Sequence, residues 1–390
     1  MKSNSDQSGV SRRRFIWACG VTIAGSPFCP AVLLRTFATD DSPRVIAGAI
    51  RWDAWYQRSD ASLSAQHSLS SARYSSRAPF FCSVANNAEV DCIGSAAEME
   101  AEIQAAVKGG LQYWAFVWYA AAGVDASLRV AWELYNKSRY RALINWCGIV
   151  GLDSLGSLPF DVSKSQANAR IWCDYMKQSN YQNVSVGTAS RPLLYILWDD
   201  GALERYFGND LKNVRAFLDY LRRTLGDAGI GSPYVTVLDG VAGSSIARDI
   251  GADAISSYIS SFVREKAAPY SELDRQTREF WKKMADTGFP MIPISMVGWD
   301  TRARQERPVP WSHAAPNPNP TMYYELPTAS ELANHVLAAV TFINQNSRSC
   351  ESKALLIYSW DECDEGGALI PTNGDPEGSY LSAISTIISK

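Results

Sequence analysis

The residues best suited to chemistry lie near the end of the chain, where Glu362 and Glu365 follow the apolar run 354–359. They are three positions apart, and on a tight turn this spacing can place both side chains on one side of the backbone. Two carboxyl groups in a partly desolvated cleft have different pKa values, so that one holds a proton while the other is ionised. Cleavage of a glycosidic bond needs these two states, which makes Glu362 and Glu365 the candidate catalytic residues.

Two other interpretations of this acidic turn remain open. The cluster 361–365 could bind calcium through its oxygens, although its spacing and the late Gly366 and Gly367 differ from the usual calcium loop. The turn could also be a solvated acidic surface. We favour catalysis, and we expect no bound metal and no cofactor.

Tryptophans and carboxylates recur together after other apolar runs. The faces of sugars present C–H groups that pack on indole rings, and their hydroxyls need hydrogen-bonding carboxylates. The set therefore predicts a carbohydrate-binding cleft, although packing alone would explain any single tryptophan. The candidate substrate-binding residues are Trp52, Asp53, Trp118, Tyr119, Trp198, Asp199, Trp299, Asp300 and Trp360.

The elements that must position these residues alternate along the chain. Apolar or β-branched runs alternate with stretches of helical periodicity, which is typical of parallel strands joined by crossover helices. Eight runs predict one (β/α)₈ barrel with long βα-loop insertions, in which residues after each strand line the functional face. The runs are 45–50, 113–118, 142–146, 193–197, 234–238, 254–257, 290–296 and 354–359.

The alternative fold is an open doubly wound sheet, which would carry a glycine-rich phosphate-binding turn after its first strand. Residues 51–56 contain no glycine, so a nucleotide site is disfavoured. Helical stretches are expected at 95–107, 126–137, 163–178, 211–226, 243–250, 271–287, 329–345 and 378–389. Capping boxes are expected at Ser95 with Glu98, Ser163 with Gln166 and Thr328 with Glu331.

Two long segments interrupt this alternation. Residues 57–87 predict an ordered surface insertion, and residues 301–327 predict a rigid proline-rich flap after the seventh strand. The flap carries Arg302, Arg304 and Arg307, which could bind an acidic glycan or lie on a solvated surface.

The first 38 residues predict a twin-arginine export signal. Residues 11–16 read Ser-Arg-Arg-Arg-Phe-Ile, and the apolar run 17–34 ends near the small residue Ala38. Glycines and prolines within that run make a membrane-spanning helix less suitable. We therefore expect a signal at 1–38 and one barrel domain at 39–390, periplasmic or secreted and not bound to a membrane after the signal is removed.

Composition and charge limit the partners. A chain with 46% hydrophobic and 20% charged residues can bury a sizeable core. Without residues 1–38, 32 basic residues stand against 39 acidic ones. An acidic surface is unsuited to neutralising phosphates, so we expect no nucleic-acid partner.

Cysteine and histidine usage adds one structural expectation. Cys82 and Cys92 flank a short polar loop and could form a disulfide in an oxidising compartment. His67, His313 and His335 are far apart in the sequence, which gives little material for a zinc site or a Ser-His-Asp triad.

The segment Tyr358–Gly366 resembles the Trp-Asn-Glu-Trp-x-Glu-Gly motif of glycoside hydrolase family 99 and the related family 99-like (WbsX-like) proteins. The segment Glu100–Tyr119 resembles the helix and second strand of that group, and residues 371–381 follow its closing loop and last helix. The resemblance implies a (β/α)₈ fold and internal cleavage of α-mannosides with retention, through a 1,2-anhydro sugar.

By position, the resemblance assigns Glu362 as the carboxylate that deprotonates the sugar 2-hydroxyl and Glu365 as the one that protonates the departing oxygen. Asp361 stands where the motif has asparagine, and Cys363 stands where it has its second tryptophan. We therefore expect a subsite wall that differs from that of the family.

The leading hypothesis is an exported glycoside hydrolase that cleaves a polysaccharide or oligosaccharide through Glu362 and Glu365. The alternative is a noncatalytic carbohydrate-binding or polysaccharide-assembly protein with the same barrel, because fold does not fix function. A metal-dependent hydrolase that uses the acidic turn is a third hypothesis.

Overall fold

The computed structural model describes residues 44–119, 126–260, 266–312 and 314–389. Residues Ser42–Lys390 form one compact unit. The expected export signal at 1–38, and also His313, lie outside the described residues. Among the residues that are described, no helix is both long enough and apolar enough to cross a membrane.

Within these ranges, eight parallel strands form the (β/α)₈ barrel that the sequence predicts, in the order β10-β11-β1-β4-β5-β7-β8-β9. The circle closes between β9 and the segment before β10, because Ile255 pairs with Met291 in parallel and exchanges hydrogen bonds with Pro290 and Ile292, both of 2.9 Å. The barrel strands are β1 Ile46–Arg51, β4 Tyr113–Trp118, β5 Asn145–Gly151, β7 Ala189–Leu197, β8 Tyr234–Leu238, β9 Ala254–Ser256, β10 Ile294–Met296 and β11 Ala354–Tyr358.

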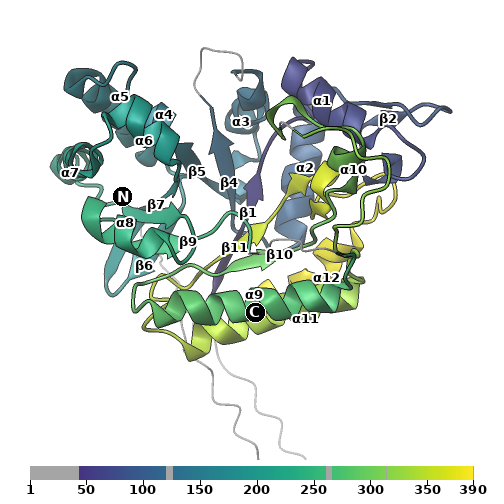
Figure 1. Cartoon of the computed structure of the whole chain (residues 1–390). Coiled ribbons are helices and arrows are strands. Elements are labelled where there is room, and N and C mark those ends of the chain that lie inside the picture. Colours follow the sequence, from purple (N-terminus) through teal and green to yellow (C-terminus); the bar gives the residue numbers. More distant parts are fainter. Residues whose placement is uncertain (1–43, 120–125, 261–265, 313, 390) are drawn as a thin grey trace, which may run out of the picture. The chain divides into compact units, whose positions relative to one another are not determined.

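Helices surround the strands, and α9, α11 and α12 lie side by side along one flank (Figure 1). The described α-helices are α1 Asp60–Leu69, α2 Ala96–Lys108, α3 Val130–Lys137, α4 Leu152–Leu155, α5 Val162–Met176, α6 Asp200–Phe207, α7 Leu211–Asp227, α8 Gly243–Ile250, α9 Tyr270–Asp286, α10 Arg302–Glu306, α11 Ala329–Gln345 and α12 Ser379–Ile388. The remaining short strands are β2 Ser83–Val84, β3 Val90–Asp91, β6 Asn183–Val186, β12 Asp361–Glu362 and β13 Gly367–Ala368.

Helix starts follow local capping chemistry at two of the three expected sites. Both partners of the capping box are present at the start of α2, and the same holds for α11. The expected cap at Ser163 is wrong. Helix α5 begins at Val162, and the carboxylate of Asp161 accepts a hydrogen bond of 2.9 Å from the N–H of Lys164. An aspartate one position before the helix can satisfy the exposed N–H groups as well as a serine can.

The expected position of the third strand is also wrong. Residues 141–143 form a 3₁₀ turn, and β5 begins only at Asn145 and continues to Gly151. Apolar residues occur on both sides of Trp146, so composition cannot fix the boundary. Pairing with β4, from Tyr113 opposite Asn145 to Trp118 opposite Val150, decides it. Trp146 therefore lies near the start of its strand and not at the functional end.

Large side chains fill the interior of the barrel. The hydroxyls of Tyr113 and Tyr195 lie 2.9 Å apart inside it. A Cβ atom at Gly48 would lie 2.3 Å from the Tyr113 ring, so glycine is needed there. Because the interior is packed, a ligand can reach the barrel only at its mouth.

The two predicted insertions are ordered where they are described. Residues 57–87 contain α1, and the hairpin of β2 and β3 follows it. Cys82 and Cys92 form a disulfide, as the sequence had suggested. The flap 301–327 contains α10 and a 3₁₀ turn at Pro310–Ser312.

Candidate active site

A cavity of about 560 Å³ opens at the carboxyl ends of the strands. Most of its described wall consists of residues at strand ends or in the loops that follow them. The polar and aromatic members of this wall are Trp52, Tyr119, Tyr258, Trp299, Arg304, Trp311, Glu362 and Glu365. The structure thus brings together both predicted catalytic glutamates and three of the predicted sugar-binding aromatic residues.

A short and heavily bonded turn positions the two glutamates. After β11, the strands β12 and β13 form a small antiparallel pair with a 3₁₀ turn, Cys363–Glu365, between them. The Ser359 hydroxyl accepts a hydrogen bond from the N–H of Glu362 and donates one to the carbonyl of Gly367, both of 2.8 Å. Gly366 ends the turn at a φ of 68°, a left-handed conformation that glycine adopts without strain.

Each glutamate carboxylate is bound by a tyrosine hydroxyl. Tyr258 donates to Oε1 of Glu362 at 2.7 Å, and Tyr358 donates to Oε2 of Glu365. Tyr258 follows β9, whereas Tyr358 is the last residue of β11. The carboxylates are therefore fixed in direction before any substrate enters.

The guanidinium of Arg304, from α10, contacts all three acidic side chains of residues 362–365. Its Nε and Nη2 bind the two oxygens of Asp364 at 2.6 and 3.0 Å. Its Nη1 binds Oε1 of Glu365, and its Nη2 lies 3.3 Å from Oε2 of Glu362. One partly buried cation thus links the three carboxylates.

The electrostatics of the two glutamates differ. The pKa of Glu362 is raised to about 8: burial is the largest cause, the charge of Glu365 adds to it, and Arg304 opposes both effects. Burial also raises the pKa of Glu365, but there the opposing charge of Arg304 is the next-largest influence. Of the pair, Glu362 is therefore the carboxyl group that the surroundings favour to keep a proton.

Trp52, Tyr119 and Trp299 lie where the sequence predicted a sugar cleft. The indole N–H of Trp52 donates to the Tyr119 hydroxyl at 2.8 Å, which joins the loop after β1 to the end of β4. The Trp299 ring packs against Tyr358, with centroids 5.6 Å apart. These three side chains form part of the cavity wall.

Asp53 and Trp360 lie instead in a buried charged cluster. Arg51 binds Asp53 and Glu102, each at 2.8 Å, and the indole N–H of Trp360 donates to Glu102 at 2.6 Å. Burial raises the pKa of Asp53 to about 6. The cluster contacts a residue of the cavity wall through Asp361, which accepts a hydrogen bond from the backbone N–H of Trp52 at 2.9 Å. Its side chains hold strand ends together and do not line the cavity.

Trp118 and Asp300 are also placed in the core and not at the cavity wall. Trp118 packs in an aromatic cluster, with its ring 4.9 Å from Trp132 and 5.2 Å from Trp172 between centroids. Asp300 is fully buried and pairs with Arg77 and with Arg302, the latter at 2.6 Å. Trp118 therefore serves packing, the explanation that the sequence had left open for any single tryptophan, whereas Asp300 binds two arginines.

Trp198 and Asp199 lie at the end of β7 but not among the residues that line the cavity. Asp199 caps α6, where its carboxylate accepts the N–H of Ala202. The indole N–H of Trp198 donates to Asp200 at 2.9 Å. These bonds shape the start of α6.

Three site residues were not predicted from the sequence: Tyr258, Arg304 and Trp311. Arg304 had been noted only as a flap arginine that could bind an acidic glycan or face solvent, and in the structure three carboxylates of the chain surround it. Trp311 is 41% exposed, and its ring lies 5.6 Å from that of Trp52. The position of Tyr258 just after β9 was the one available signal.

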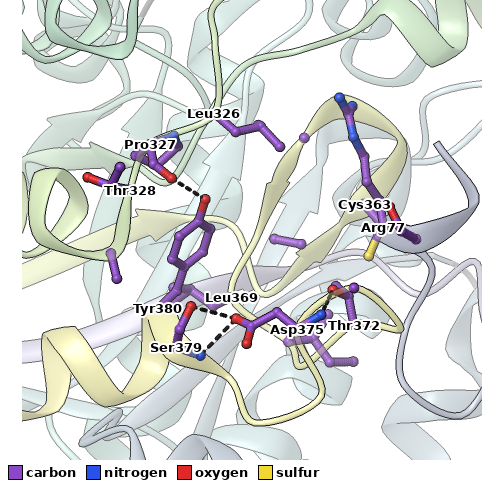
Figure 2. A pocket seen from close by; sticks show the side chains of 16 residues that line it. Arg77, Leu326, Pro327, Thr328, Cys363, Leu369, Thr372, Asp375, Ser379 and Tyr380 are labelled. Atoms are coloured by element: carbon purple, nitrogen blue, oxygen red, sulfur yellow. Dashed lines mark hydrogen bonds between the residues drawn. The ribbon is translucent and has the colours of Figure 1, made fainter. Parts of the chain in front are cut away.

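A second cavity, of about 380 Å³, lies behind the same turn (Figure 2). Cys363 lines this second cavity and is not among the residues that line the first. Cys363 therefore does not form part of the wall beside the glutamates. Around this second cavity Tyr380 donates to the carbonyl of Pro327, and Asp375 accepts from the N–H and hydroxyl of Ser379 (Figure 2).

Within the described ranges, no group of three or more His, Cys, Asp or Glu side chains is arranged to hold a metal ion. The acidic turn, which could have bound calcium, instead surrounds the guanidinium of Arg304.

No protein-family model matches the chain, and no curated protein matches it. Among solved structures, the chain is similar to the GH99 endo-alpha-mannosidase from Bacteroides thetaiotaomicron in complex with bis-tris-propane. The identity is 12%, the match covers 88% of this chain and 96% of that one, and the TM-score is 0.49. A second structure of that enzyme gives 11% identity over 87% and 95%, with a TM-score of 0.46. Family 99, which the sequence resembles, is thus the family of both structures.

A further similar structure is the beta-glucuronidase from Parabacteroides merdae. It has 11% identity over 77% of this chain and 36% of that one, with a TM-score of 0.40.

Proposed function

We propose that the protein is a glycoside hydrolase that cleaves a polysaccharide or oligosaccharide, with Glu362 and Glu365 as the reacting pair. The observation that carries this proposal is that two carboxylates of one turn line a single aromatic-walled cavity at the mouth of the barrel. A buried pair of carboxyl groups that keeps one proton has the acid and the base that glycosidic cleavage needs.

The walls of the cavity suit a sugar ring. The indoles of Trp52, Trp299 and Trp311 offer apolar faces for C–H groups, while Tyr119 and Tyr258 bring hydroxyls for polar contacts. The cavity volume of about 560 Å³ lies within the range of sites for small ligands or for one part of a longer chain.

The different surroundings of the two carboxyl groups support a role for each glutamate. Glu362 holds the proton and gives it to the glycosidic oxygen as the bond to the anomeric carbon breaks. Glu365 is ionised and takes a proton from the nucleophile that forms the new bond at that carbon. This assignment reverses the one implied by the family resemblance, and it follows from the closer contact of Arg304 with Glu365.

A noncatalytic carbohydrate-binding protein is the second candidate, and one observation favours it. All four carboxylate oxygens of Glu362 and Glu365 already have donors in Tyr258, Tyr358 and Arg304. A substrate must therefore compete with these contacts before it can receive a proton.

We also propose export through the twin-arginine segment at 1–38, which would make the mature protein periplasmic or secreted. The disulfide between Cys82 and Cys92 supports this proposal because such bonds persist mainly in oxidising compartments.

The decisive experiment is incubation of the chain without residues 1–38 with defined bacterial and fungal polysaccharides, with products identified by mass and anomeric configuration. We expect E362Q and E365Q each to lose at least about a hundredfold in turnover while remaining folded, as for general acid–base groups. E204Q, at an exposed position of α6, is the matched control. Binding of a glycan without product release by the wild-type protein would favour the noncatalytic alternative.

A substrate with a good leaving group separates the two roles, because it needs little help from an acid. We expect E362Q to recover more activity than E365Q on an aryl glycoside of the same sugar. The opposite result would return the roles to those implied by the resemblance.

A further inference from the structure

We propose that Arg304 is a positioning residue that sets the direction of both glutamates and decides which of them is ionised. Its catalytic consequence depends on the proposed function, whereas its effect on the carboxyl groups does not. Nothing in the sequence motif around the glutamates includes this arginine, which lies almost sixty positions earlier in the flap.

The planar guanidinium acts as a rigid fork. Its bidentate contact with Asp364 fixes the plane of the group, because both oxygens of that carboxylate are engaged at 2.6 and 3.0 Å. The remaining N–H directions then point at one oxygen of Glu362 and one of Glu365. A lysine ammonium has no fixed plane, so it cannot impose three directions at once.

Helix α10 holds Arg304 firmly. Arg302 binds Asp300 through two nitrogens, at 2.8 and 2.6 Å. The Gln305 side chain donates to the carbonyl of Met322 at 2.9 Å. Neighbouring residues of α10 are thus anchored as well, and we infer that Arg304 is a fixed part of the cavity.

Aromatic rings support the guanidinium from the cavity side. Its central carbon lies 5.4 Å from the centroid of the Trp52 ring and 5.8 Å from that of Trp311. Cations are attracted to such ring faces, and this contact helps to keep a desolvated charge in place. The same two rings form part of the cavity wall, so Arg304 also fixes the surface that a sugar would meet.

Arg304 contacts the two glutamates unequally, and this difference determines which glutamate is ionised. Nη1 binds Glu365 directly, whereas Nη2 is shared between Asp364 and Glu362 and lies 3.3 Å from the latter. The other titratable groups that contact the pair are the hydroxyls of Tyr258 and Tyr358, one on each glutamate. Each glutamate has one tyrosine donor, whereas Arg304 is shared unequally between them, so we take Arg304 as the group that distinguishes the two carboxyls.

The test is a titration that needs no substrate. The chain is labelled with ¹³C at its glutamate side-chain carboxyls, and E362Q and E365Q assign the two signals by NMR. We expect R304Q to raise the pKa of Glu365 by at least about one unit, a tenfold change in its ionisation constant. R304K should raise it less, because the charge remains. An unchanged Glu365 titration in R304Q would overturn the proposal.

R275Q is the matched control, since Arg275 on α9 also pairs with two carboxylates, Glu272 and Glu279, and neither lies in the cavity wall. Its Glu365 titration should match that of the wild type, and a shift as large as in R304Q would assign the effect to the loss of any arginine charge and overturn the role of Arg304. If R304Q does not fold, D364N replaces it. This variant frees the plane of the guanidinium, and both glutamate titrations should then change.

Turnover gives the second readout on any polysaccharide that the wild type cleaves. We expect R304K to lower kcat at least about tenfold with KM changed less than about twofold, because the charge is kept and the direction is lost. If the wild type cleaves nothing, the proposed function fails while the titration still decides the role of Arg304. Equal kcat for R304K and the wild type would overturn the positioning role.

Discussion

The exchange of Glu362 for glutamine should make the protein more stable at high pH than the wild type, and this tests the desolvation on which the site depends. Glu362 is 4% exposed, and burial raises its pKa from 4.5 to about 8. That difference corresponds to about 5 kcal/mol of unfavourable free energy when the folded protein ionises this group. Glutamine has nearly the same shape and never ionises.

The direction of this pH dependence follows from proton binding in the folded and unfolded states. Below pH 4.5 both the folded and the unfolded chain hold the proton on Glu362. Between pH 4.5 and about 8 the unfolded chain loses it while the folded chain keeps it, so the free energy of unfolding of the wild type falls with rising pH. The free energy of unfolding of E362Q lacks this contribution to the pH dependence. The stability of E362Q relative to the wild type should therefore increase across this pH window and then level off.

Urea unfolding followed by tryptophan fluorescence, at pH values from 4.5 to 9, measures this difference directly. E204Q makes the same chemical change at an exposed position, and its curve should stay parallel to that of the wild type. If the difference between E362Q and the wild type changes by less than about 1 kcal/mol over the window, Glu362 is not desolvated. The assignment of the resting proton to it would then be wrong.

Two further predictions concern the cavity wall and the insertion. W299A should raise KM for a cleaved polysaccharide about tenfold with a smaller effect on kcat, because one sugar-facing ring is lost. W198A, at a position outside the cavity wall, should change KM less than about twofold. Equal effects of the two variants would refute the assignment of Trp299 to the wall. Reduction of the bond between Cys82 and Cys92 should lower the free energy of unfolding by about 2 to 3 kcal/mol, as expected for a loop of this length. The C82A/C92A variant should not respond to reductant, and an equal response in both proteins would assign the effect to another group.

The barrel was largely predictable because strands and helices leave local patterns. The predicted limits of β4 and β8 agree with the structure, and so do those of α8 and α11. The error in the third strand has a tertiary cause, since pairing with β4 selects one register from a longer apolar run. Capping boxes were predictable for a similar reason, because each one involves residues only three positions apart.

The candidate site was only half predictable, and the reason is visible in consecutive residues. In each of the three pairs 52–53, 118–119 and 299–300, one side chain lines the cavity and its neighbour does not. Adjacent side chains of an extended chain point in opposite directions, so the type of a residue at a strand end does not say which way it faces. The sequence predicted the aromatic and acidic character of the strand ends but not the choice within each pair.

The sequence by itself determined the alternation of strands and helices, the number of barrel strands and the two glutamates on one turn. All of these depend on residues close together in the chain. Only the tertiary structure decided that Arg304 and Trp311, from the flap, meet Glu362, Glu365 and Tyr258 in one cavity. No local pattern marks such a meeting. It arises when the closed barrel brings loops from distant parts of the sequence to the same mouth, where burial and one shared cation set the chemistry of the carboxylates.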